Sequence, residues 1–141
     1  KEEKDGTITK TVTIDYKYPR KMDNCSLERV SGLCLAGIYR DWIRVYVPKG
    51  SKLIKSSGSE VAFATSEDLD KTVFDAFFTI RPEGTAKLTL EYTIPIKVTG
   101  EYKLLIQKQP GTEGHMYEIE AFGHKQKAFP LTTDKELIVK P

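Results

Sequence analysis

The stretch Lys87-Leu-Thr-Leu-Glu-Tyr-Thr-Ile-Pro-Ile-Lys-Val98 alternates apolar and polar side chains over its whole length. Its apolar positions are Leu88, Leu90, Tyr92, Ile94, Ile96 and Val98. A period of two places all of these side chains on one face of a β-strand. Pro95 falls on the polar side, and because it has no N–H to donate, it indicates an edge position or a bend. The stretch therefore predicts a strand with one buried face.

Alternation of the same kind continues on both sides of this strand. Thr99-Gly-Glu predicts a turn into a strand over 102–108, so the two strands are expected to form a hairpin. Pro48-Lys-Gly-Ser and Gln109-Pro-Gly-Thr-Glu-Gly are turn sequences. Further strands are predicted over 8–18, 39–47, 52–55, 60–65, 73–80, 116–122 and 136–139.

The number and spacing of these segments indicate an all-β fold. No segment keeps the three-to-four spacing of an amphipathic helix beyond about two turns. Eight or nine short strands favour an antiparallel, immunoglobulin-like sandwich of two sheets, with a closed barrel as the alternative. A chain of 141 residues is expected to form a single domain over residues 1–141. Because it begins at Lys, we expect it to be a piece of a longer protein.

The charge balance of the chain argues against some kinds of partner, and its hydropathy argues against a membrane-spanning helix. The chain has 22 Lys and Arg against 20 Asp and Glu, which leaves a net charge of +2. Such interspersed charges give no reason to expect a nucleic acid or an anionic membrane surface as partner. No apolar run approaches the roughly 20 residues that a spanning helix needs, and the first six residues contain no signal-peptide core.

Two cysteines, Cys25 and Cys34, lie in a long connection between the first two predicted strands. Their spacing matches neither a Cys-x-x-Cys motif nor half of a zinc site. We therefore expect a disulfide, although two free thiols in a cytosolic protein is the alternative. Closing a loop of about 10 residues would stabilise the fold by roughly 2.5–3 kcal/mol. Because disulfides persist outside the reducing cytosol, the pair indicates an exported protein.

The strand after the cysteine loop carries the candidate binding surface, which consists of Tyr39, Trp42, Arg44 and Tyr46. Flat aromatic rings of this kind can stack on the faces of sugars. Trp and Tyr in a strand more often pack in the core. The two interpretations predict opposite exposures for Trp42, and the core interpretation is preferred on sequence.

Other residue groups fall short of a chemical site. Those resembling metal ligands are His115, Glu118, Glu120 and His124, which lack an Asp-x-Asp loop or a His-x-x-x-His motif. An acidic segment that ends directly before Lys71 is interpreted as a plain turn; its acids are Glu67, Asp68 and Asp70. Asn24-Cys-Ser matches the N-glycosylation pattern and is interpreted as an unmodified loop.

No Gly-x-Ser-x-Gly elbow is present, and neither histidine has the context of a catalytic triad. We accordingly expect no catalytic residues, no cofactor and no metal. The chain is expected not to be an enzyme.

The segments Tyr39-Arg-Asp-Trp-Ile-Arg-Val-Tyr-Val-Pro-Lys-Gly-Ser-Lys-Leu, Phe74 to Pro82, Leu88 to Pro95 and Leu105-Ile-Gln-Lys-Gln-Pro-Gly-Thr carry a resemblance. Over most of residues 7–140 the chain resembles the C-terminal, β-rich region of uncharacterised envelope proteins of candidate-phyla bacteria, which carry a domain of unknown function upstream. The resemblance implies a membrane-anchored, exported parent protein. It implies no catalytic residues.

Together these observations predict a non-enzymatic, extracellular structural or recognition module of a bacterial surface protein. Its expected partner is a protein or a glycan at the cell surface, and the expected location is extracellular or in the cell envelope, with the anchor in parts outside this chain. The alternative is an accessory domain of an envelope enzyme that acts on polysaccharide, with the active site elsewhere in the parent protein.

Overall fold

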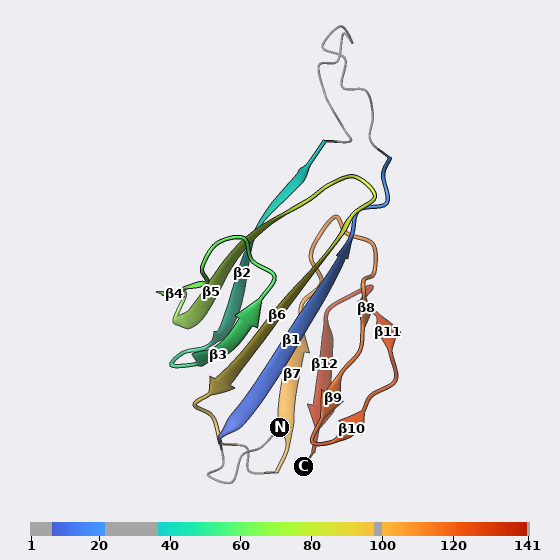
Figure 1. Cartoon of the computed structure of the whole chain (residues 1–141). Helices are drawn as coiled ribbons and strands as arrows, with labels where there is room; N and C mark the ends of the chain where they lie inside the picture. The colour runs from blue at the N-terminus through green and yellow to red at the C-terminus, as the bar shows by residue number, and fades with distance from the viewer. Residues whose placement is uncertain (1–6, 22–36, 98–99, 141) are drawn as a thin grey trace, which may run out of the picture. The chain divides into compact units, whose positions relative to one another are not determined.

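The computed structural model describes residues 7–21, 37–97 and 100–140, which form β-strands and connections without a helix (Figure 1). The chain divides into two compact units, one over Thr9–Pro95 and the other over Ile96–Pro141 together with Lys1–Ile8. Each unit is described by itself below. The described residues include no helix long and apolar enough to cross a membrane.

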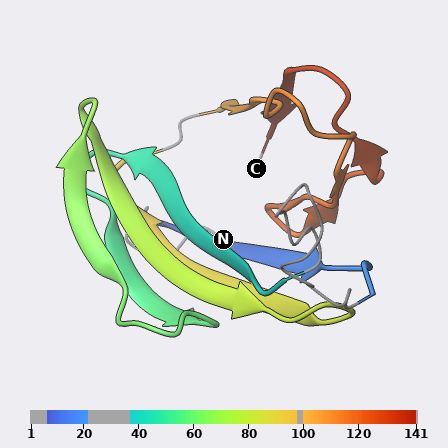
Figure 2. The same ribbon diagram turned by 90° about the horizontal axis from the view of Figure 1, so that it is seen from above.

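The first unit contains two three-stranded sheets. One has the order β1-β6-β3, formed by Ile8–Lys17, Thr85–Ile94 and Lys52–Ser57. The other has the order β2-β5-β4, formed by Tyr39–Pro48, Lys71–Ile80 and Ala64–Asp68. β3 pairs with β6, and β2 and β4 pair with β5, all in antiparallel register. In Figures 1 and 2 β2 and β5 run side by side along their length.

The core of this unit lies where the two sheets contact each other. From β6, every second side chain is buried, as its alternation predicts: Leu88, Leu90, Tyr92 and Ile94. From β5, the buried apolar side chains that face this core are Phe74, Ala76, Phe78 and Ile80. The ring of Phe74 lies 5.6 Å from that of Tyr92, and the Phe78 ring lies 4.7 Å from that of Tyr16 on β1. Burial of these apolar faces is the main stabilising contribution to the unit.

The second unit is built from three small antiparallel pairs. β7 (Tyr102–Ile106) pairs with β12 (Lys135–Val139) over five residues. β8 (Met116–Tyr117) pairs with β11 (Phe129–Pro130), and β9 (Glu120–Ala121) with β10 (His124–Lys125). Stacked rings of Tyr117 and Phe129, with centroids 6.0 Å apart, join the β8–β11 pair. These short pairs bury far fewer large side chains than the first unit.

Backbone conformation at the turns explains how the chain reverses. Leu69 and Asp70 join β4 to β5 with φ values of 48° and 56°, the arrangement of a two-residue type I′ hairpin. Pro48-Lys-Gly-Ser closes a turn between β2 and β3, in which the Ser51 N–H donates to the Pro48 carbonyl over 3.1 Å. Gly50 in this turn has a φ of 83°, a conformation that favours glycine.

The all-β, antiparallel class expected from the sequence is confirmed, as are most of the predicted strands. The described residues form twelve strands in five sheets, in place of the eight or nine strands in two sheets that we expected. Strand 60–65 is displaced to Ala64–Asp68, and 116–122 is divided into β8 and β9. The expectation of a single domain remains a prediction. Both cysteines of the predicted disulfide, Cys25 and Cys34, and the Asn24 motif lie outside the described residues.

The predicted hairpin between strands 87–98 and 102–108 is wrong. β6 ends at Ile94, directly before Pro95, where the chain bends. It is the central strand of its sheet, so β1 and β3 already take both of its edges. No edge remains for the next strand, and β7 pairs with β12 instead.

Candidate functional site

The side of sheet β2-β5-β4 that points away from the core carries a group of aromatic and charged side chains. We call this side the outer face, and its central members are Trp42, Arg44, Tyr46, Ser66, Asp68, Asp75 and Phe77. Alternation in β2 places Trp42, Arg44 and Tyr46 on this face. Ile43, Val45 and Val47 point the other way. The regular register with β5 sets Trp42 opposite Phe77 and Arg44 opposite Asp75.

Three of the four residues predicted as a binding surface lie together on this face. The fourth, Tyr39, is an odd number of positions away from Trp42 and therefore projects from the opposite side of the strand. Its ring lies 6.1 Å from that of Tyr18. Burial, followed by the nearby Asp41 carboxylate, raises its pKa. Tyr39 thus belongs to a different surface from Trp42.

Trp42 is 60% exposed, so the preferred interpretation of this residue as part of the core is wrong. Its ring contacts that of its cross-strand neighbour Phe77, with centroids 5.9 Å apart and planes inclined at 42°. Such tilted aromatic pairs stabilise each other beyond their buried area. The contact supports one part of the indole and leaves the remainder open to solvent.

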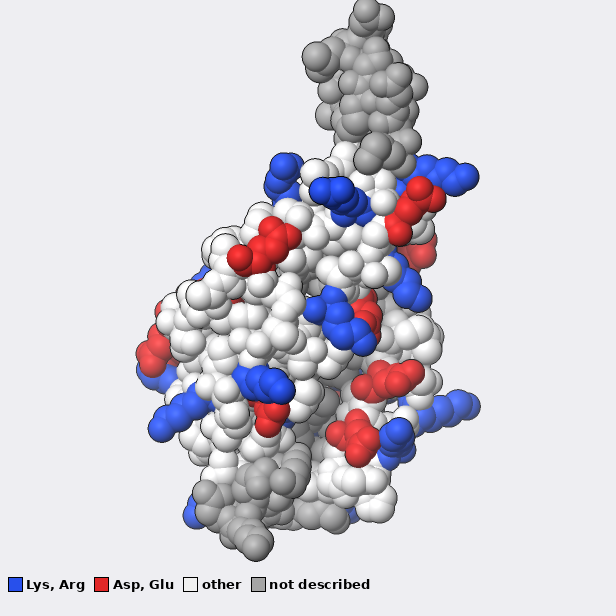
Figure 3. All heavy atoms as spheres, viewed as in Figure 1, with Lys and Arg blue, Asp and Glu red and all other residues white. Residues whose placement is uncertain are grey.

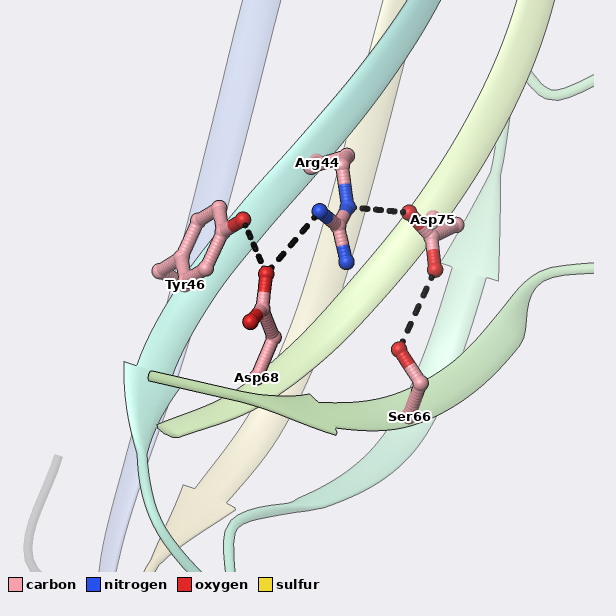
Figure 4. A network of polar contacts seen from close by, with 5 residues as sticks. All are labelled: Arg44, Tyr46, Ser66, Asp68 and Asp75. Atoms are coloured by element: carbon pink, nitrogen blue, oxygen red, sulfur yellow. Dashed lines mark hydrogen bonds and ion pairs between the residues drawn. The ribbon is translucent and has the colours of Figure 1, made fainter. Parts of the chain in front are cut away.

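Beside this pair, a network of charged hydrogen bonds crosses the sheet (Figure 4). Arg44 donates from Nε to Asp75 Oδ1 and from Nη1 to Asp68 Oδ2, each over 3.1 Å. Tyr46 donates its hydroxyl to Asp68 Oδ2 over 2.9 Å. Ser66 Oγ donates to Asp75 Oδ2 over 3.4 Å. The guanidinium is thereby fixed between two carboxylates that come from different strands.

This network also covers the centre of the sheet. Arg44 and Tyr46 on β2 reach Asp68 on β4, so their bonds extend across the intervening strand β5. Val73 of β5 lies in register between Tyr46 and Ser66 and points to the outer face, yet it is fully buried. The long stems of the surrounding side chains account for this burial. The polar groups are therefore packed on an apolar support.

Electrostatic effects follow from the same geometry. The hydrogen bond from Tyr46, and then the Arg44 guanidinium, lower the pKa of Asp68. The same hydrogen bond is the main cause that raises the pKa of Tyr46. Arg44 also lies 5.3 Å from the centre of the Tyr46 ring, a cation–π distance. At neutral pH the network therefore contains a neutral Tyr46 phenol and an ionised Asp68 carboxylate beside the guanidinium.

The edge of β5 beyond the end of β4 is satisfied by side chains. Ser59 Oγ accepts from the Phe77 N–H and donates to the Phe77 carbonyl, both over 3.1 Å. Glu60 Oε1 accepts from the N–H and the hydroxyl of Thr79 over 2.7 and 2.6 Å. Donation from the Thr79 hydroxyl is the main cause that lowers the pKa of Glu60. These bonds hold the backbone under the Trp42–Phe77 pair.

The acidic segment Glu67, Asp68 and Asp70, interpreted from the sequence as a plain turn, forms ion pairs at two places on the sheet. Lys49 binds Asp70 over 3.0 Å and Glu67 over 3.5 Å at the end of the sheet. Asp68 belongs to the network on the outer face. Each acid of the segment thus has a cationic partner.

The residues weighed as metal ligands lie in the second unit. Glu120 is in β9 and His124 in β10, whereas His115 and Glu118 flank the two residues of β8. Within the described part of the chain, no three His, Cys, Asp or Glu side chains are grouped as a metal site would require.

Sequence patterns missed the contributions of β4 and β5. Asp75 interrupts the apolar run Val73–Ile80, which was the available signal for a polar group on that strand. Pairing this residue with Arg44 requires the order β2-β5-β4, which alternation within single strands does not encode. Phe77 falls within the predicted strand 73–80, but alternation within that strand does not show which residue it faces on the neighbouring strand.

Charged side chains on the face drawn in Figure 3 are interspersed, with Lys and Arg next to Asp and Glu among the described residues.

The chain matches no protein-family model, no curated protein and no solved structure.

Proposed function

We propose that this chain is a non-enzymatic recognition module of a bacterial surface protein, and that it binds its partner through the outer face of sheet β2-β5-β4. In this proposal the unit over Thr9–Pro95 is an immunoglobulin-like sandwich of two sheets. The aromatic contacts between β5 and the strands of the opposite sheet support that arrangement. Export and anchoring of the parent protein rest on the cysteine pair and on the resemblance to envelope proteins.

The observation that carries the proposal is the exposure of Trp42 beside an ordered group of polar side chains. A large aromatic side chain that is 60% exposed forgoes most of the stabilisation that burial would give it. Its neighbours Arg44, Asp68 and Asp75 are held in place by mutual bonds, so a ligand would meet them with little further loss of side-chain entropy. Trp, Tyr and Arg are also the residue types that dominate binding energy at interfaces.

A parallel binding screen tests the proposal. The purified chain would be applied to an array of immobilised glycans and to a library of displayed random peptides. Each ligand found would then be titrated against wild type, Trp42→Ala and Ile54→Ala. Ile54 is a suitable control because it is also an exposed apolar residue, but it lies on β3 of the other sheet.

The proposal expects at least one ligand whose binding is lost in Trp42→Ala and retained in Ile54→Ala. Circular dichroism of each variant checks that it is folded. Absence of any ligand, or ligands that Trp42→Ala binds as well as wild type does, would contradict recognition through this face.

A further inference from the structure

The ligand class follows from the chemistry of the outer face, on the assumption that the proposed function holds. We propose that the face binds the neutral pyranose ring of a glycan, with the apolar C–H face of the ring against Trp42 and the ring hydroxyls bonded to Arg44 and to its cross-strand partner Asp75.

The first argument is the combination of groups. A pyranose presents a flat apolar face and, at its rim, hydroxyls that both donate and accept hydrogen bonds. Trp42 offers a partly exposed, flat aromatic surface of matching kind. Two positions along β2 and on the same face, the Arg44 side chain is 41% exposed and offers donors, and its cross-strand partner Asp75 is 13% exposed and offers acceptors. One ligand ring can use the apolar and the polar groups together.

The second argument is that hydrogen-bonding capacity remains after the internal bonds are formed. Arg44 uses Nε and Nη1 for the two aspartates, and among the described residues none bonds to its Nη2. Each carboxylate accepts two side-chain bonds within the network, whereas a carboxylate has about four lone-pair sites. A pair of neighbouring hydroxyls can therefore donate to a carboxylate and accept from Nη2 while the network stays intact.

The third argument is charge, which separates neutral from anionic ligands. The guanidinium is already balanced by two carboxylates, so the network has one net negative charge. On and beside the face, four cations stand against five carboxylates: Arg40, Arg44, Lys49 and Lys71 against Glu60, Glu67, Asp68, Asp70 and Asp75. No positive excess is left to attract a nucleic acid or an anionic polysaccharide.

The fourth argument is size, which favours a sugar over a protein. A standard protein interface covers about 800 Å² per partner around an apolar, fully desolvated centre. On the outer face the charged network begins with Arg44 and Asp75, next to the Trp42–Phe77 pair, and Val73, which lies beyond them opposite Tyr46, is buried. The apolar surface that adjoins the network at this point is the paired rings of Trp42 and Phe77, which is sufficient for a single pyranose.

The test uses intact chain and three groups of probes on one array: neutral oligosaccharides, oligosaccharides containing uronic acids, and random peptides. Trp42 is the only tryptophan of the chain, so its fluorescence reports ligand binding at this position without any substitution. A neutral oligosaccharide that binds is expected to change this fluorescence saturably. Its dissociation constant should rise at least about tenfold in Trp42→Ala and stay within about twofold of wild type in Ile54→Ala.

Arg44→Lys supplies an independent check of the polar contacts, since it keeps the charge and loses the planar donor group. It is expected to weaken the same neutral ligand by about threefold or more. Capture of peptides alone, with loss in Trp42→Ala, would overturn the sugar assignment and leave the recognition module standing. Capture of uronic-acid glycans alone, with loss in Trp42→Ala, would overturn the choice of a neutral ring and likewise leave the recognition module standing. Failure of all three probe groups would contradict both proposals.

Discussion

Replacing Trp42 and Phe74 by alanine in two separate variants is expected to lower the free energy of unfolding by different amounts, because one residue is exposed and the other lies in the core. These residues lie on adjacent, paired strands of one sheet, but Trp42 is 60% exposed and Phe74 is fully buried. Fully burying an aromatic side chain removes about 150–250 Å² from water. For Trp42 the hidden 40% amounts to roughly 100 Å², which at about 25 cal/mol per Å² sets an upper limit of about 2.5 kcal/mol.

The expected cost of Trp42→Ala is lower than this limit, at about 1–2 kcal/mol, because the unfolded chain already hides part of its apolar surface. Phe74→Ala removes a ring packed against Tyr92 and leaves a cavity, so it is expected to cost about 3–5 kcal/mol. Urea unfolding, monitored by far-ultraviolet circular dichroism, measures both free energies. Tryptophan fluorescence is unsuitable because Trp42→Ala lacks the only tryptophan of the chain. Equal losses in the two variants, or a larger loss for Trp42→Ala, would refute the placement of Trp42 on an open face.

Three further predictions concern the backbone and the network. Gly58→Ala places a Cβ onto the Lys87 carbonyl oxygen of β6 and should lower the free energy of unfolding by several kcal/mol. Gly111→Ala is also at positive φ but meets open space, so it should cost only about 1–2 kcal/mol. Similar thermal midpoints for the two variants would contradict this. Leu69→Asn, at a φ of 48° in the type I′ turn, should raise stability by about 0.5–1 kcal/mol in urea unfolding, and a decrease would count against the turn assignment. Because the pKa of Asp68 is lowered in the folded state, its contribution is present above its unfolded value of about 3.8 and is lost as pH falls through the folded value. The difference in urea midpoint between wild type and Asp68→Asn should therefore shrink from pH 7 to pH 3, and a difference independent of pH would show that the carboxylate is not held by the network.

Local alternation was sufficient to predict most of the longer strands and, for β6, the side that is buried. The buried set of β6 is the apolar set of its sequence, and β2, β5 and β7 begin or end within two residues of their predicted limits. Failures arose where pairing between strands decides the outcome. The hairpin of β6 with β7 was plausible by proximity in the chain, but both edges of β6 are used by strands from elsewhere.

The candidate site shows the same division. Trp42, Arg44 and Tyr46 were identified from one strand, and the period of two already separates Tyr39 from them. Exposure of the face could not be predicted, because a strand with apolar and aromatic residues on alternate sides is also typical of burial on both faces. The partners Asp75 and Asp68 belong to strands that become neighbours only in the folded sheet.

Quenching of the single tryptophan by acrylamide tests the central claim, the exposure of Trp42 on the outer face, most directly. Acrylamide quenches indole on contact, so its rate constant measures access to Trp42 in the folded chain. With 60% of the residue exposed, the quenching constant of the native protein should reach about half or more of the value in urea-unfolded protein. A native value near zero, as for a tryptophan inside a packed core, would contradict the exposed face and the recognition function proposed for it.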